Sequence, residues 1–227
     1  MRRGLDGKNI VNSTRDRLER LEPGLPLTEG GVGELEPKED GRASLVRGLI
    51  ERDPQAASRF HRQYARLISQ LVWRLLGADS EHDDVVHQVY VNILGSIGSL
   101  RKPASLDSWV TGVAINTVRR EIHRRKFRRL LHLVPDYQDR DLAAARPEKE
   151  LALCRFYELL DRLGANERIV LLLHLMEGYS LGQIASLLHY STPTAKRRFQ
   201  AGKRRFLELA QTEPLLTQWV EELRHEP

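Results

Sequence analysis

The 227-residue sequence contains one cysteine, and it has no apolar run of the roughly 20 residues that a membrane span requires. Cys154 has no second cysteine with which to form an internal disulfide, which favours a reducing compartment. The N-terminal residues MRRGLDGKNIVNSTRDRLER carry no apolar segment of the kind found in signal peptides. We therefore expect a cytoplasmic protein that does not insert into a membrane.

Catalytic signatures are also lacking. The sequence has no P-loop, no paired CxxC motifs and no Ser/His/Asp set, and its eight histidines form no metal-binding spacing. The nearest candidates for metal ligands are His82, Asp83, Asp84 and His87, but neighbouring helical side chains point about 100° apart, so the two carboxylates would not converge on one ion. We expect no catalytic residue, no metal, no cofactor and no small-molecule substrate.

What the sequence has in quantity is charge. Lys and Arg number 36 against 31 Asp and Glu, giving a net charge of +5 and an isoelectric point near 9.5. With 41% hydrophobic residues the chain can also form proper cores, in one large domain or two small ones. Because the net charge is small, the positions at which basic residues cluster say more about the binding partner than the net charge does.

Helical periodicity dominates after the first 43 residues, and no segment alternates as a strand would. The sequence predicts an all-α protein of two small helical domains joined by a flexible linker. Residues 1–43, rich in Pro, Gly and mixed charge, predict a disordered extension. The remaining ranges are a first domain at 44–129, a linker at 130–148, a second domain at 149–211 and a C-terminal tail at 212–227.

A helix-turn-helix is predicted in the second domain. Ser180 and Gln183 have capping-box spacing for a first short helix, and Thr192 can cap a second helix with Pro193 at its first position. The apolar residues of that second helix face inward, which leaves a basic face outward, where arginine and glutamine suit base edges in the major groove. The alternative is an ordinary solvated basic face on a helical hairpin. The residues on or beside the basic face are Thr192, Pro193, Thr194, Lys196, Arg197, Arg198, Gln200 and Arg204.

A second basic cluster lies in the first domain. Residues 119–129 hold seven Arg or Lys and one acid, Glu121, at the end of a predicted helix. The helix dipole alone favours basic residues near a helix C-terminus. Seven are more than capping of the helix requires, so the alternative interpretation is that they bind a phosphate backbone. Trp109 falls on the apolar face of this helix and is predicted to be core rather than a stacking platform. Two basic surfaces joined by a linker predict two separate contacts with DNA.

Residues 44–211 resemble bacterial RNA polymerase sigma factors of the sigma-70 family, of the extracytoplasmic-function (ECF) type. The runs DDVVHQVYVNIL and SLDSWVTGVAINTVRREIHRRK resemble the family's region 2, and ANERIVLLLHLMEGYSLGQIASLLHYSTPTAKRRFQAGKRRFLE resembles region 4 without a gap. The resemblance implies a sigma factor that binds core RNA polymerase and directs promoter-specific initiation. A helix-turn-helix regulator that binds duplex DNA without polymerase remains the alternative.

The resemblance also implies roles for residues. Asp84 matches the acidic residue of the clamp-facing motif, and Asn116 matches the asparagine of the promoter-melting helix. Region 4 would read the −35 element through the helix-turn-helix and meet the polymerase flap, and an anti-sigma factor is suggested as a further partner. The core polymerase set is Asp83, Asp84, His87 and Gln88. The −10 set is Arg101, Lys102, Asn116, Arg119, Arg120, Arg124 and Arg125.

Some positions depart from the family pattern. His87 and Gln88 stand where Gln-Glu is usual, and Ile115 stands where Arg is common. His189 replaces the glycine of the turn, where a positive φ would cost about 1 kcal/mol relative to glycine. Two further departures are Arg120 in place of a frequent Asp and Gly164 in place of a usual proline.

Overall fold

The computed structural model describes residues 39–77, 79, 81–130, 148–217, 220, 221 and 223. Within these residues every regular element is helical, which confirms the all-α prediction. They divide into two compact units between Glu121 and Ile122, inside one long helix. Residues 1–38 of the predicted extension and residues 131–147 of the predicted linker lie outside the described residues, so the predicted domain ranges stay a prediction.

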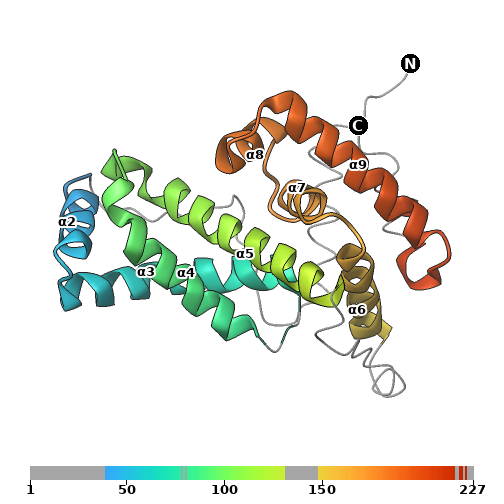
Figure 1. Ribbon diagram of the computed structural model, residues 1–227, viewed down its shortest axis with the longest axis horizontal. Coiled ribbons are helices and arrows are strands. Elements are labelled where there is room, and N and C mark those ends of the chain that lie inside the picture. Colours follow the sequence, from blue (N-terminus) through green and yellow to red (C-terminus); the bar gives the residue numbers. More distant parts are fainter. Residues whose placement is uncertain are drawn as a thin grey trace. The chain divides into compact units, whose positions relative to one another are not determined.

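The first unit contains four helices and two short 3₁₀ turns (Figure 1). Helix α2 begins within the segment predicted to be a disordered extension, and it packs against α3 and against both turns, η1 and η2. The elements are α2 (Glu39–Ile50), α3 (Pro54–Leu76), α4 (His82–Ser96), η1 (Ile97–Ser99), η2 (Pro103–Ser105) and α5 (Leu106–Leu130), the last of which continues past the boundary between the units.

Helix α3 begins where Asp53, as a capping residue, and Pro54, as the first helical residue, predict it, but Ala56 and Ile68 are buried in place of the predicted Ala57 and Leu67. The Asp53 carboxylate accepts hydrogen bonds from the backbone N–H groups of Gln55 and Ala56, with Pro54 at the first helical position. Gly77, with φ 84°, ends the helix in a conformation that favours glycine. The apolar side chains buried along the helix, spaced by three or four residues, include Ala56, Phe60, Tyr64, Ile68, Leu71 and Leu75.

The buried faces of α4 and α5 differ in register from those that the apolar spacing predicts, which are Val86, Val89, Ile93 and Ile97 in α4 and Leu106, Trp109, Val113, Val118 and Ile122 in α5. In α4 the buried residue of the first turn is Val85, and Val86 is only partly buried. In α5, Trp109 and Val113 are partly buried, so the placement of Trp109 in the core is wrong. Both stripes advance in steps of four residues, and a large indole at the edge of such a stripe is rarely covered completely. The stripe of α5 is Leu106, Val110, Ala114, Val118 and Ile122.

The second unit is a cluster of four helices closed by a 3₁₀ turn. Helix α9 packs against α7 and α8, and α6 packs against α9 and the turn η4. Gly202 allows the closest approach, because a Cβ there would lie 3.1 Å from the Glu167 backbone oxygen of α7. The elements are α6 (Glu148–Asp161), α7 (Ala165–Leu175), α8 (Leu181–Leu188), α9 (Thr192–Ala210) and η4 (Pro214–Leu216). None of the described helices is long and apolar enough to cross a membrane.

The segment after α9 is part of the fold, although the sequence predicted a tail from residue 212. Leu216, Val220 and Leu223 are all buried, and η4 packs against α6. The spacing of these three residues, four and then three, is the amphipathic pattern that the sequence analysis overlooked because the segment is short.

Leu216→Ala is expected to destabilise the protein by about 2–5 kcal/mol, because it leaves a cavity beneath η4. The measurement is denaturant unfolding of the full chain. Leu215 is the matched control, since it lies in the same turn and is only partly buried. Equal losses for Leu215→Ala and Leu216→Ala would contradict the packing described for this segment.

Candidate nucleic-acid interface

Helices α8 and α9, with the turn between them, form the predicted helix-turn-helix. The capping box of α8 is present: the Ser180 backbone N–H donates to Gln183 Oε1 at 2.8 Å, and the Gln183 N–H donates to Ser180 Oγ at 3.3 Å. Ile184 and Leu188 are buried on the inner face of the helix. Local sequence therefore sets both the start of α8 and the face that it turns inward.

The turn itself depends on His189. This residue ends α8 in the left-handed conformation, with φ 55° and ψ 42°. The next residue, Tyr190, donates its backbone N–H to the Ala185 oxygen at 2.8 Å, which closes the helix end. The geometry usually supplied by glycine is thus kept with a histidine, at the expense of backbone strain.

His189→Gly is expected to stabilise the second unit by about 0.5–1 kcal/mol, because glycine adopts this conformation without the Cβ penalty. Thermal unfolding would detect the change as a higher Tm. Ser186→Gly, at an exposed position inside α8, is the matched control and should be destabilising by a similar amount. A lower Tm for His189→Gly would show that the turn is not strained.

Helix α9 begins one residue earlier than the sequence predicted. Ser191, not Thr192, is the N-cap, and its Oγ accepts the Thr194 backbone N–H at 3.3 Å. Pro193 consequently occupies the second helical position, where its missing N–H is still tolerated. The prediction failed because Ser and Thr stand side by side and either can cap.

The outward face of α9 is as predicted. Ala195 and Phe199 are fully buried, while the side chains on the opposite side are exposed. Arg204 is 79% exposed, with only a 3.9 Å approach to Glu208 one turn further along. This face therefore presents charge and hydrogen-bond donors to solvent. Its exposed members among the predicted residues are Thr192, Pro193, Lys196, Arg197, Gln200 and Arg204, with Thr194 partly buried.

Arg198 differs from its neighbours. It is partly buried, and its guanidinium lies over the Tyr190 ring at 4.6 Å from the centroid. The Tyr190 hydroxyl in turn donates to Asn166 Oδ1 of α7 at 2.8 Å. Sequence reasoning missed Tyr190 and Asn166, because their contacts join the turn to two separate helices and leave no periodic signal.

The basic residues of the first domain lie along α5 and in the loop before it. Arg101 and Lys102 are exposed between η1 and η2. Asn116 donates its side-chain amide to the Gly112 oxygen at 2.9 Å, and Arg120 is exposed beside it, with its Nε directed to the Asn116 oxygen. Further along the helix, Arg124 is exposed, while Arg119 and Arg125 are partly buried.

The four residues predicted to face polymerase lie on the exposed side of α4. Asp83 and Asp84 occupy the first turn, where the helix dipole favours acids. His87 and Gln88 are exposed one turn later. Among the described residues, no group of three or more His, Cys, Asp or Glu could hold a metal ion.

An apolar pair that sequence reasoning did not predict extends this face of α4. Val91 and Leu94 are each 47% exposed, although they lie in a helix whose inner stripe is well buried. Both fall out of phase with the steps of four from Val85 to Ile97, which is the signal that could have revealed them. Exposed aliphatic side chains beside polar ones are a common composition for a protein interface.

Comparison with known proteins places both units in one family. The family model described as Sigma-70 region 2 matches residues 60–128, and the model described as Sigma-70, region 4 matches residues 155–206. Two curated relatives are the ECF RNA polymerase sigma factor SigM of the Erdman and H37Rv strains of Mycobacterium tuberculosis. The first is 26% identical over 172 residues, covering 75% of this chain and 85% of SigM. The second is 26% identical over 168 residues, covering 74% and 83%.

A solved structure shares the fold. CnrH, determined in complex with the cytosolic domain of CnrY, superposes with a TM-score of 0.50 at 18% sequence identity, covering 76% of this chain and 97% of CnrH. Taken with the two family matches, these observations define the class: the chain belongs to the sigma-70 family. Within that family it is a sigma factor of the ECF type.

As a sigma factor it binds core RNA polymerase and directs initiation of transcription at promoters. Members of this family are regulators of transcription and not enzymes. The alternative of an autonomous helix-turn-helix regulator finds no support in these matches.

Proposed function

We propose that the two units divide promoter recognition between them, with α9 reading the −35 element as duplex and the α5 region holding the −10 element. The observation that carries this proposal is the separation of faces on α9. Fully buried Ala195 and Phe199 fix the helix against its unit, so that Arg197 and Gln200 are presented outward. A recognition helix needs this arrangement in order to enter the major groove.

Chemistry assigns different tasks along α9. The Arg197 guanidinium can bind guanine O6 and N7 with two hydrogen bonds, and the Gln200 amide can pair with adenine N6 and N7. Lys196 and Arg204, both exposed, would bind phosphates on either side. Arg198 is held over Tyr190, so we assign it to a backbone phosphate at the edge of the groove.

For the −10 element we propose the loop and helix of the first unit. Arg101 and Lys102 would bind the phosphate backbone of the unpaired −10 strand. Asn116, which lies in α5, would also contact the promoter. The basic side chains that continue along α5 would hold the duplex just upstream by charge. They are Arg119, Arg120, Arg124 and Arg125.

For core polymerase we propose the exposed face of α4, with the clamp as its partner. Asp83, Asp84, His87 and Gln88 would form the polar part of this contact. Val91 and Leu94 would supply the apolar part, because exposed aliphatic side chains gain most when a partner covers them. The polymerase flap would bind the second unit.

The wider proposals follow from family membership and from the sequence. We propose the ranges 44–129 and 149–211 as the two working domains, the second extended by the packed segment after α9, with a linker at 130–148, action in the cytoplasm and no catalytic reaction. CnrH was solved with the cytosolic domain of CnrY bound, and we propose that this chain is likewise held by an anti-sigma partner.

Binding-site selection with and without core polymerase tests the proposal. Duplex DNA would be selected by the isolated protein and, separately, by the protein bound to core polymerase. We expect the holoenzyme to select two elements and the isolated protein to bind weakly with little preference. Tight, sequence-specific duplex binding by the isolated protein, unchanged by core polymerase, would favour the autonomous regulator.

A further inference from the structure

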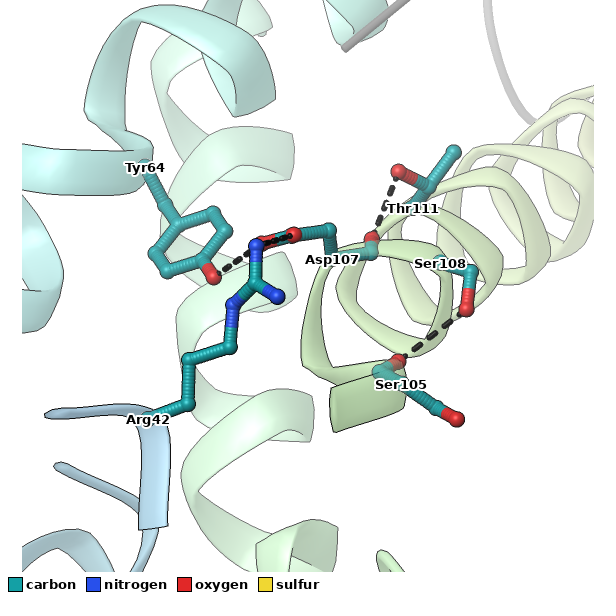
Figure 2. Close-up of polar contacts among 6 residues, drawn as sticks. All are labelled: Arg42, Tyr64, Ser105, Asp107, Ser108 and Thr111. Carbon is teal, nitrogen blue, oxygen red and sulfur yellow. Dashed lines mark hydrogen bonds and ion pairs between the residues drawn. The ribbon is translucent and has the colours of Figure 1, made fainter. Parts of the chain in front are cut away.

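Side chains from three helices meet at the start of α5 (Figure 2). Arg42 comes from α2, Tyr64 from α3 and Asp107 from the first turn of α5. The Tyr64 hydroxyl donates to Asp107 Oδ1 at 2.5 Å, and Arg42 Nη2 donates to Asp107 Oδ2 at 2.7 Å. Each oxygen of one carboxylate is therefore bound by a different helix.

This cluster is shielded from water. Tyr64 is fully buried, and the side chains of Arg42 and Asp107 are only 22% and 15% exposed. Burial, and after it the hydrogen bond to Asp107, raise the pKa of Tyr64 above its ordinary value, so the phenol stays protonated and donates to Asp107 even in alkaline solution. Removing one partner of a shielded ion pair strongly destabilises the fold, because the other charge is left buried and uncompensated. Arg42, Tyr64 and Asp107 therefore hold α2, α3 and α5 together, and we call these three residues the joint.

The joint lies beside the loop that carries Arg101 and Lys102. Helix α2 packs against η1 and η2, the two turns on either side of these residues. It also packs closely on α3, since a Cβ on Gly48 would lie 2.6 Å from the Ala56 Cβ. Helix α2 precedes residue 60, where the match to the region 2 family model begins.

We propose that Arg42, Tyr64 and Asp107 are positioning residues for promoter opening: through α2 they fix the loop 100–105 and the start of α5 in the geometry that captures the −10 strand. This inference rests on the proposed function of the loop and α5. None of the three residues needs to touch DNA. Their contribution is pre-organisation, because a loop that is already ordered loses less entropy when it binds a flexible strand.

The two DNA contacts should respond differently when the joint is broken. Capture of single-stranded −10 DNA depends on the loop and should weaken. Binding of duplex −35 DNA depends on α9, which belongs to the second unit, and should stay unchanged. A general loss of folding would lower both.

The test uses holoenzyme assembled with core polymerase of the source organism. The probes are a single-stranded oligonucleotide of the non-template −10 strand and a duplex −35 fragment, both from a promoter recovered by transcript mapping with the wild-type protein. Arg42→Met should weaken −10 binding about tenfold and change −35 binding less than twofold. Tyr64→Phe keeps the ring in the core and should act in the same direction, while Arg42→Lys should restore most of the binding.

Two further variants make the result decisive. Ile68→Val removes one buried methyl group one turn along α3 from Tyr64, leaves the hydrogen bonds to Asp107 in place, and should leave both affinities unchanged. The double variant Arg101→Ala/Lys102→Ala tests the loop directly. If the loop variant loses −10 binding and Arg42→Met does not, this inference is wrong and the proposed function stands. If neither variant loses binding, or if no promoter is recovered, the proposed function fails and the inference falls with it.

Discussion

Asp84→Arg is expected to lower the affinity for core RNA polymerase at least tenfold. Asp84 is exposed in the first turn of α4, on the face that also presents Gln88 and Val91. Reversing its charge within a complementary interface replaces an attraction with a repulsion, and unfavourable charge pairs at interfaces cost several kcal/mol. Titration of labelled core polymerase with each variant would measure the loss.

The control for Asp84→Arg separates binding from helix stability. Arginine in the first turn of a helix opposes the dipole by about 0.3–1 kcal/mol wherever it is placed. Gln55→Arg puts the same side chain at an exposed position in the first turn of α3, and it should leave core affinity within twofold. Wild-type affinity for Asp84→Arg would remove α4 from the polymerase interface.

Arg197→Ala is expected to weaken binding of the −35 element by about 1–3 kcal/mol, or roughly 5- to 150-fold. The side chain is exposed at the start of α9, one helical turn from Gln200. Losing a bidentate contact should also relax the base preference at one position. Selection of −35 sequences by the variant holoenzyme would show both effects.

Removing a positive charge elsewhere in the second unit should weaken binding of the −35 element less than Arg197→Ala does. Arg162→Ala removes one exposed arginine from the same unit without touching α9. It should reduce −35 binding less than twofold and leave every base preference intact. If Arg162→Ala and Arg197→Ala weaken binding equally, and preferences stay as in the wild type, then α9 does not read bases.

The sequence predicted the parts of the fold that depend on local signals. Ser180 and Gln183 mark the start of α8, and Asp53 with Pro54 marks the start of α3, because caps involve residues within four positions of one another. The outward face of α9 follows from the inward spacing of its apolar residues. Where two capping residues were adjacent, at Ser191 and Thr192, the choice between them was wrong.

Long-range contacts could not be predicted in the same way. The bond between Arg42 and Asp107 joins residues 65 positions apart, and no periodicity connects them. The stack of Arg198 on Tyr190 depends on the path of a turn that a histidine closes. The apolar pair of α4 was missed for a different reason: the exposure of Val91 and Leu94 follows only once the register of the buried stripe, from Val85 to Ile97, is known.

In vitro transcription tests the central claim most directly. Purified protein would be added to active core RNA polymerase of the source organism with a genomic DNA library, and transcripts would be mapped at their 5′ ends. The account predicts new start sites that share a −10 and a −35 element and that disappear with Asp84→Arg. An active core polymerase that gains no start site on addition of the protein would contradict it.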